Sequence, residues 1–192
     1  MCQSISGRNA GLLFHQAGYS LVELLVVTAL AAVLSMLAIP PMTEMINSQR
    51  SIALASAFLS SLNLARAEAI KRNGRAVLCK SADGLACADS GGWEQGWIVF
   101  HDADNDAALD DAEQVIERYA GGADGLTLSG NAPVANYVSF SASGSAKHVS
   151  GAFQAGTFTL CPLSSSQSDI RQLVLSSTGR ARSKKGVATD CQ

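Results

Sequence analysis

The residues of this sequence that could most plainly do chemistry form a basic tail near its C-terminus. Arg180 and Arg182 follow Gly179, and Lys184 and Lys185 extend the positive charge. Two arginines at positions i and i+2 of an extended segment project to the same side of it. Their guanidinium forks suit phosphate oxygens, whereas the lysines add charge without such a fork. The tail therefore predicts binding of phosphate groups, and a solvated basic turn is the alternative interpretation.

A second group of polar residues forms an acidic loop. Carboxylates occupy positions 1, 3, 5, 9 and 12 of an EF-hand-type spacing, at Asp102, Asp104, Asp106, Asp110 and Glu113. Hard cations favour oxygen ligands spaced in this way. The sixth position is Ala107, where the motif needs glycine for a sharp turn, and no pair of amphipathic helices flanks the loop. We therefore favour a solvated acidic turn and predict no metal and no cofactor, while calcium binding by this loop stays an open alternative.

The element that leads into these groups begins with a long apolar segment. Across residues 21–39, Glu23 is the only charged side chain. At a rise of about 1.5 Å per residue, a helix of this length covers about 28 Å, which is enough to cross a bilayer core. An isolated carboxylate is costly in such a segment, so we expect Glu23 to have a partner.

This segment and the residues before it resemble the class III leader and N-terminal helix of type IV pilins and type II secretion pseudopilins. The resemblance rests on Gly18, the aromatic Tyr19, Glu23 and Pro40 at the end of the apolar run. It implies that a prepilin peptidase cleaves after Gly18, that the new N-terminus at Tyr19 is methylated, and that Glu23 pairs with the amino group of a neighbouring subunit. Tyr stands where Phe is usual, and Arg8 is the one firm positive charge of the leader. An ordinary signal peptide would instead be cut after its apolar region.

We expect the chain to have four parts. Residues 1–18 form the leader, and residues 19–40 form a transmembrane and assembly helix. Residues 41–74 continue this helix in amphipathic form, and residues 75–192 form a β-rich head that ends in the basic tail. The head is long enough for a single domain.

The helix is expected to continue past Pro40 and Pro41 and to end at Asn73 and Gly74. Its second part carries one apolar stripe at helical spacing, formed by Leu54, Phe58, Leu62, Ala65 and Ala69. Short segments with strand character follow, at residues 75–80, 96–101, 114–119, 126–129, 137–142, 157–161 and 172–176. This order predicts an α+β fold, and the resemblance makes it type IV pilin-like. In that fold a long N-terminal helix, membrane-embedded in its first half, packs on an antiparallel, β-rich C-terminal head.

The head narrows the resemblance further. Residues 92–100 read GWEQGWIVF and lead into the acidic loop and then into a short segment at residues 113–118. This order is similar to that of the GspH/FimT family of minor pilins and pseudopilins, which has a Trp-x-x-Gly-Trp strand followed by an acidic loop. We expect Trp93 and Trp97 to pack in the core or at its rim rather than to form a ligand platform.

One cysteine lies in the predicted leader, and the other four lie in the head. Cys2 would leave with the leader, whereas Cys79, Cys87, Cys161 and Cys191 belong to a head outside the cytoplasm, where disulfides persist. Four cysteines permit three pairings. We favour Cys79–Cys87, which closes a short loop, and Cys161–Cys191, which ties the tail to a strand. A zinc site is disfavoured, because the sequence has no C-x2-C pair and no histidine near a cysteine.

The charge is unevenly distributed although the formal net charge is only −2. Most acidic residues lie within residues 83–124, where Arg118 is the only Lys or Arg, whereas basic residues outnumber acidic ones in the tail. No P-loop, dinucleotide-binding fingerprint or Gly-x-Ser-x-Gly motif is present, and His101 and His148 stand far apart in the sequence. We therefore expect no enzymatic activity.

The tail carries the sharpest functional hypothesis. The order Gly179, Arg180, Ala181, Arg182 resembles the Gly-Arg-x-Arg tail of FimT-like minor pilins, which bind DNA at the pilus during natural transformation. The resemblance implies that DNA binding involves Gly179, Arg180, Arg182, Lys184 and Lys185. No aromatic residue stands beside the arginines, so we expect no base-stacking platform, and binding that follows the DNA backbone without sequence preference should be weak for one subunit.

The resemblance thus implies a minor type IV pilin that takes part in DNA uptake. Its precursor would be a single-pass protein of the bacterial inner membrane with its head in the periplasm, and the mature subunit would lie in the pilus. The expected partners are other pilin or pseudopilin subunits, prepilin peptidase, the inner membrane and DNA. The alternatives are an H-type minor pseudopilin of a type II secretion system and a pilus-priming minor pilin that does not bind DNA.

Overall fold

The computed structural model describes residues 18–122, 125–163 and 170–191, without the side chains of residues 36–44. The chain forms two compact units, residues 1–42 and 43–192, which we describe separately. The predicted leader lies outside the described residues except for Gly18, and Cys2 and Arg8 lie outside them as well.

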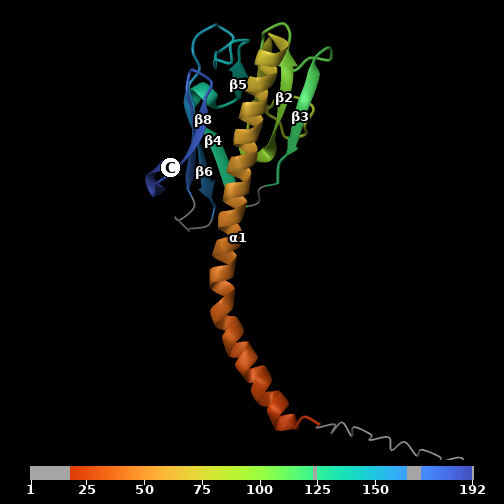
Figure 1. The fold of residues 1–192 in the computed structure, drawn as a ribbon, viewed down its shortest axis with the longest axis vertical. Coiled ribbons are helices and arrows are strands. Elements are labelled where there is room, and N and C mark those ends of the chain that lie inside the picture. The colour runs from red at the N-terminus through yellow and green to blue at the C-terminus, as the bar shows by residue number, and fades with distance from the viewer. Residues whose placement is uncertain (1–17, 123–124, 164–169, 192) are drawn as a thin grey trace, which may run out of the picture. The chain divides into compact units, whose positions relative to one another are not determined.

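One helix, α1 (Leu21–Arg72), contributes residues to both units (Figure 1). The predicted continuation past Pro40 and Pro41 is confirmed. In the first unit, Glu23 lies in the first turn of α1, and every side chain from residue 21 to residue 35 is exposed. Leu21 and Leu34, for example, are 78% and 66% exposed. Within the described residues, no helix combines the length and the apolar character that crossing a membrane requires.

The second part of α1 forms one side of the core of the head. The predicted stripe is confirmed, because Leu54, Phe58, Leu62, Ala65 and Ala69 are all buried. The helix ends where the sequence predicts: the Gly74 N–H donates to the Ala69 carbonyl oxygen at 3.1 Å, and Asn73 has a φ of 50°.

The first sheet has the strand order β3-β2-β1-β5 and is antiparallel throughout. Its strands are β1 (Arg75–Lys80), β2 (Gly96–Asp102), β3 (Gln114–Ala120) and β5 (Tyr137–Phe140). One face packs on α1 through side chains that include Leu78, Trp97, Val99 and Phe140. The opposite face buries Val77, Cys79, Ile98 and Phe100, with Leu109 and Val115 packed against them. This sheet is therefore covered on both faces.

The second sheet has the order β4-β6-β7-β8 and is also antiparallel. Its strands are β4 (Leu126–Gly130), β6 (Gly156–Pro162), β7 (Arg171–Leu175) and β8 (Ala181–Lys185). The face toward α1 is apolar and includes Leu128, Phe158, Leu160, Leu173 and Leu175. In Figure 1, β2 and β3 of the first sheet lie to the right of the head portion of α1, whereas β5 and the second sheet's β4, β6 and β8 lie to its left. The predicted α+β fold, with a helix packed on an antiparallel β-rich head, is confirmed.

Phe58 lies at the centre of an aromatic cluster that joins the helix to both sheets. Its ring makes edge contacts with Trp93, Trp97 and Phe158, with centroid distances of 5.1, 5.0 and 4.7 Å. The Trp97 Nε1–H donates to Ser61 Oγ at 2.9 Å, so its one polar atom is satisfied inside the core. Both tryptophans are fully buried, which confirms that they pack in the core.

Both predicted disulfides are present. Cys79 and Cys87 are bonded with a Cα–Cα distance of 5.6 Å, and Cys161 and Cys191 are bonded with a Cα–Cα distance of 5.8 Å. The second bond joins β6 to the residue after the short 3-10 helix η4 (Ala188–Asp190). The C-terminal segment is thereby fixed to the second sheet.

Candidate functional site

The basic tail is not a free end but the edge strand β8, and Ser176 shapes the turn that leads into it. The Ser176 N–H donates to the Arg180 carbonyl oxygen at 3.0 Å, and the Gly179 N–H donates to the Ser176 carbonyl oxygen at 2.9 Å. The Ser176 hydroxyl oxygen also accepts the Arg180 N–H at 3.2 Å. These bonds set the register of the hairpin and so decide where each cation points.

Gly179 packs inside this turn and is buried. It has a φ of 79°, and a Cβ placed on it would lie 2.0 Å from the Gly144 carbonyl oxygen. The Arg66 Nε–H from α1 donates to that same oxygen at 2.9 Å. Only a residue without a side chain fits here, so Gly179 shapes the turn, and its predicted part in DNA binding stays a prediction.

The strand register sorts the cations onto two faces. Arg182 pairs with Val174 and Lys184 pairs with Gln172, whereas Leu173 and Leu175 of β7 point into the core. Because side chains alternate along a strand, Arg182 and Lys184 lie on the outer face of the second sheet. Lys185 pairs with Arg171 and follows the inner-face series. The sequence placed Lys184 and Lys185 together, and the structure separates them.

Arg180 and Arg182 line the same hollow on the outer face. This hollow has a volume of about 340 Å³ and is also lined by Val174 and Ser176. Arg180, Arg182 and Lys184 are all exposed. We call these three residues the basic strip. In the described part of the chain, the ion pairs join Glu68 to Lys71 and Arg72, and Arg75 to Asp102, so no carboxylate there neutralises the strip.

Several hydroxyl groups share the outer face with the basic strip. Thr157 pairs with Val174 and Thr159 pairs with Gln172, so these hydroxyl groups lie on the same face as the basic strip. On the next strand, Ser129 pairs with Thr159 and continues the polar surface. A face of hydroxyl groups beside exposed guanidinium groups suits a hydrated, anionic ligand better than an apolar one.

Both ends of β8 are held in place. The turn at Ser176 fixes its start, and the Gly186 N–H donates to the Ile170 carbonyl oxygen at 2.8 Å just after its end. Beyond that point the chain returns to β6 through the Cys161–Cys191 disulfide. A ligand of the basic strip therefore meets a backbone that is already ordered, which lowers the entropic cost of binding.

The sequence missed three features of this site. Strand β8 has the sequence ARSKK, which has no alternation of apolar and polar residues, so only its pairing with β7 identifies it as a strand. The separation of Lys184 from Lys185 depends on the same register. No local sequence signal places Arg66 beside Gly144 and Gly179.

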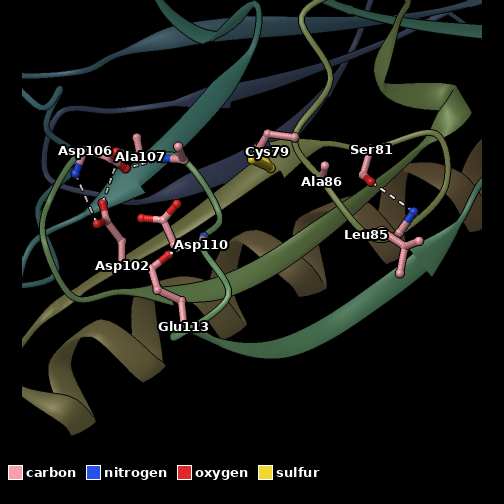
Figure 2. Close-up of a disulfide and its surroundings, with 12 residues drawn as sticks. Cys79, Ser81, Leu85, Ala86, Asp102, Asp106, Ala107, Asp110 and Glu113 are labelled. Carbon is pink, nitrogen blue, oxygen red and sulfur yellow. Dashed lines mark hydrogen bonds between the residues drawn. A yellow bond between two sulfur atoms is a disulfide. The ribbon is translucent and has the colours of Figure 1, made fainter.

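The acidic loop closes on itself (Figure 2). Asp102 is 1% exposed, and its carboxylate accepts the N–H groups of Asn105 at 2.7 Å, Asp106 at 3.2 Å and Ala107 at 3.1 Å. The carboxylate oxygens of Asp102, Asp104 and Asp106 lie within 4.8 Å of one another. Burial raises the pKa of Asp102 above its usual 3.8, against the lowering effect of these N–H groups and of Arg75.

The rest of the loop fits the interpretation as an acidic turn. Ala107 adopts a φ of 63°, so it makes the sharp turn that the motif assigns to glycine. Glu113 accepts the N–H groups of Ala103 at 2.7 Å and Asp110 at 3.3 Å, and thus joins the two ends of the loop. The loop N–H groups and Arg75 satisfy the buried carboxylate, and calcium binding stays an untested alternative.

Comparison with known proteins decides the family. Residues 54–179 match the model of the type II transport protein GspH, and residues 13–39 match the prokaryotic N-terminal methylation motif. The chain belongs to the GspH family. The first match ends at Gly179, so Arg180, Arg182, Lys184 and Lys185 lie beyond the residues that the family model covers. No curated protein matches this GspH-family chain.

Several solved structures are similar to this GspH-family chain. The type IV minor pilin FimU of Pseudomonas aeruginosa PAO1 is similar in two crystal forms. In one form, FimU is 20% identical with a TM-score of 0.50, and the match covers 69% of this chain and 90% of FimU. In the other form, the identity is 21% and the TM-score is 0.52, and the match covers 75% of this chain and 92% of FimU. The minor pseudopilin EpsH of the Vibrio cholerae type II secretion system is 14% identical over 71% of this chain and 97% of EpsH, with a TM-score of 0.44.

The family and the fold together define the coarse function. This GspH-family chain is a subunit of the minor pilin or pseudopilin class, whose members assemble with other pilin-like subunits. Such proteins are structural subunits rather than enzymes.

Proposed function

We propose that this protein is a minor type IV pilin that binds extracellular DNA without sequence preference, for uptake in natural transformation. The observation that carries the proposal is the basic strip. Arg180 and Arg182 line one hollow, Lys184 lies on the same face, and the described residues offer these cations no acidic partner. Phosphate oxygens are the ligands that such a row of exposed guanidinium groups fits best.

The strip supports backbone contacts rather than base recognition. Three cations on an exposed sheet face can contact successive phosphates, and phosphate contacts carry no sequence information. Affinity should therefore be weak for one subunit, independent of sequence and strongly dependent on salt.

The N-terminal part of the proposal concerns processing and assembly. Prepilin peptidase cleaves after Gly18, Tyr19 becomes the methylated N-terminus, and Glu23 pairs with the N-terminal amine of a neighbouring subunit. The precursor sits in the inner membrane through the apolar segment 21–39, with the head in the periplasm. The match to the methylation motif over residues 13–39 and the exposed apolar side chains of the first unit support this part.

The second candidate is the H-type minor pseudopilin of a type II secretion system. The name of the matched family, a type II transport protein, favours it. The two candidate functions differ in what they require of the basic strip. A pseudopilin that acts in assembly and secretion does not need a strand that binds phosphate.

Fluorescence anisotropy of a labelled DNA duplex, titrated with the full chain in a non-ionic detergent, tests the proposal. We expect the double variant Arg180→Ala/Arg182→Ala to lose most of the affinity at low salt. Arg118→Ala is the matched control, since it removes one exposed arginine from β3, in the other sheet. If wild type and double variant bind the duplex with equal affinity, the secretion pseudopilin becomes the favoured function.

A further inference from the structure

A short hairpin at residues 145–154 lies next to the turn that leads into the basic strip. The Ala146 N–H donates to the Ser177 carbonyl oxygen at 3.1 Å, which joins this hairpin to the β7–β8 turn. Ala146 and Phe140 form one isolated bridge, and Lys147 and Phe153 form another. Figure 1 shows the hairpin at the same end of the head as the start of β8. Its position follows from pairing between distant segments and not from its own sequence.

The hairpin presents an aromatic ring to solvent. Phe153 is 70% exposed, and the Lys147 ammonium lies 5.6 Å from the centre of its ring. Ala146 points into the core. Its neighbour Lys147, paired with Phe153, therefore points away from the core. An aromatic ring and a cation thus lie on the hairpin whose Ala146 contacts the turn before the strip.

The base of this hairpin is held by several hydrogen bonds. Gln154, next to Phe153, is fully buried, and its side chain bonds the Ser139 N–H at 3.0 Å and the carbonyl oxygens of Pro133 and Tyr137 at 2.8 and 2.9 Å. The His148 N–H donates to the Ala152 carbonyl oxygen at 2.8 Å and closes the loop. The ring is therefore held on an ordered support, so a ligand that stacks on it orders little backbone.

We propose that Phe153 stacks on an unpaired base, so that the head binds single-stranded DNA more tightly than duplex. This inference rests on the proposed function, because the basic strip holds the backbone while Phe153 receives a base. Bases of a duplex are already stacked on their neighbours, whereas an unpaired base has a free face. The sequence predicted no stacking platform because Phe153 is far from the arginines along the chain, and the fold brings its hairpin to their turn.

Two titrations of the full chain in a non-ionic detergent test the inference, one with oligothymidylate and one with a blunt hairpin duplex. Phe153→Ala should weaken binding of oligothymidylate by about 5- to 150-fold, the range that base stacking on an aromatic residue gives. Binding of the duplex should not change. Leu85→Ala is the matched control, because Leu85 is equally exposed, at 69%, but lies in the loop closed by the Cys79–Cys87 disulfide.

A spectroscopic variant reports the contact directly. Trp93 and Trp97 are fully buried, so Phe153→Trp adds the one exposed indole of the protein. Its fluorescence should be quenched by oligothymidylate and not by the duplex.

The outcomes separate the two proposals. If Phe153→Ala binds oligothymidylate as tightly as wild type, or weakens both probes equally, the stacking inference is wrong. If Arg180→Ala/Arg182→Ala still weakens both probes in that case, the proposed function stands alone. If the arginine variant binds both probes as tightly as wild type, the proposed function is wrong, and the stacking inference that rests on it is lost as well.

Discussion

Gly179 packs directly against the carbonyl oxygen of Gly144. The space between them is so small that a Cβ on Gly179 would lie 2.0 Å from that oxygen. Arg66 donates to the same oxygen at 2.9 Å, so helix α1, the loop at residue 144 and the turn before β8 meet at one point. This contact places Arg180 at the start of the basic strip.

Replacing Gly179 by alanine should therefore be costly. The positive φ alone costs about 1–2 kcal/mol in unfolding free energy, and the clash adds to it. Gly151→Ala is the matched control, because Gly151 has a similar φ of 85° but open space around its Cβ position. Denaturant unfolding of both variants measures the difference. Equal destabilisation of the two variants would mean that the contact with Gly144 contributes nothing.

Lys184 and Lys185 should differ although they are neighbours in the chain. Lys184 shares a face with Arg182, whereas Lys185 pairs with Arg171 on the opposite side. Lys184→Ala should weaken DNA binding and reduce the magnitude of the salt slope by about 0.9, and Lys185→Ala should change neither quantity much. Anisotropy titrations at several salt concentrations compare them. A larger effect of Lys185→Ala would contradict the assignment of the binding face.

The Cys161–Cys191 disulfide should matter for binding as well as for stability. Its sequence separation is 30 residues, against 8 for Cys79–Cys87, so chain-entropy estimates give about 3.6 kcal/mol of stabilisation against about 2.5. The paired variant Cys161→Ser/Cys191→Ser should lower the unfolding free energy and also weaken DNA binding, because it frees the end of β8. The matched variant Cys79→Ser/Cys87→Ser should lower stability only. The reverse pattern would show that the tether does not organise the strip.

The mature N-terminus should be an N-methylated Tyr19. Mass spectrometry of the protein isolated from membranes measures this directly. Gly18→Ala should retain some cleavage, whereas a bulky residue at that position should abolish it. A mature terminus beyond residue 39, or an uncleaved chain, would refute processing at Gly18.

Local sequence patterns were sufficient to predict most of the fold. The stripe from Leu54 to Ala69 has a helical period, and strands such as β1 and β2 are apolar runs bounded by turn residues, so both were found from the sequence. The disulfide pairing was also predicted, since one pairing closes a short loop and the other ties down the tail.

The parts that were missed depend on register and on contacts between distant residues. Strand β8 becomes a strand only because the Ser176 turn folds it back on β7. A shift of one residue in that register would exchange the faces of Lys184 and Lys185. The meeting of Arg66 with Gly144 and the approach of residues 145–154 to Ser177 join segments that no local pattern relates.

The salt dependence of DNA binding tests the central claim most directly. Three cations on one face release counterions when they contact phosphates, so log K against log salt should have a slope of about −2.7 for the full chain. The double variant Arg180→Ala/Arg182→Ala should leave a slope of about −0.9, from Lys184 alone. Identical slopes for wild type and double variant, or no binding of duplex DNA at low salt, would contradict the account.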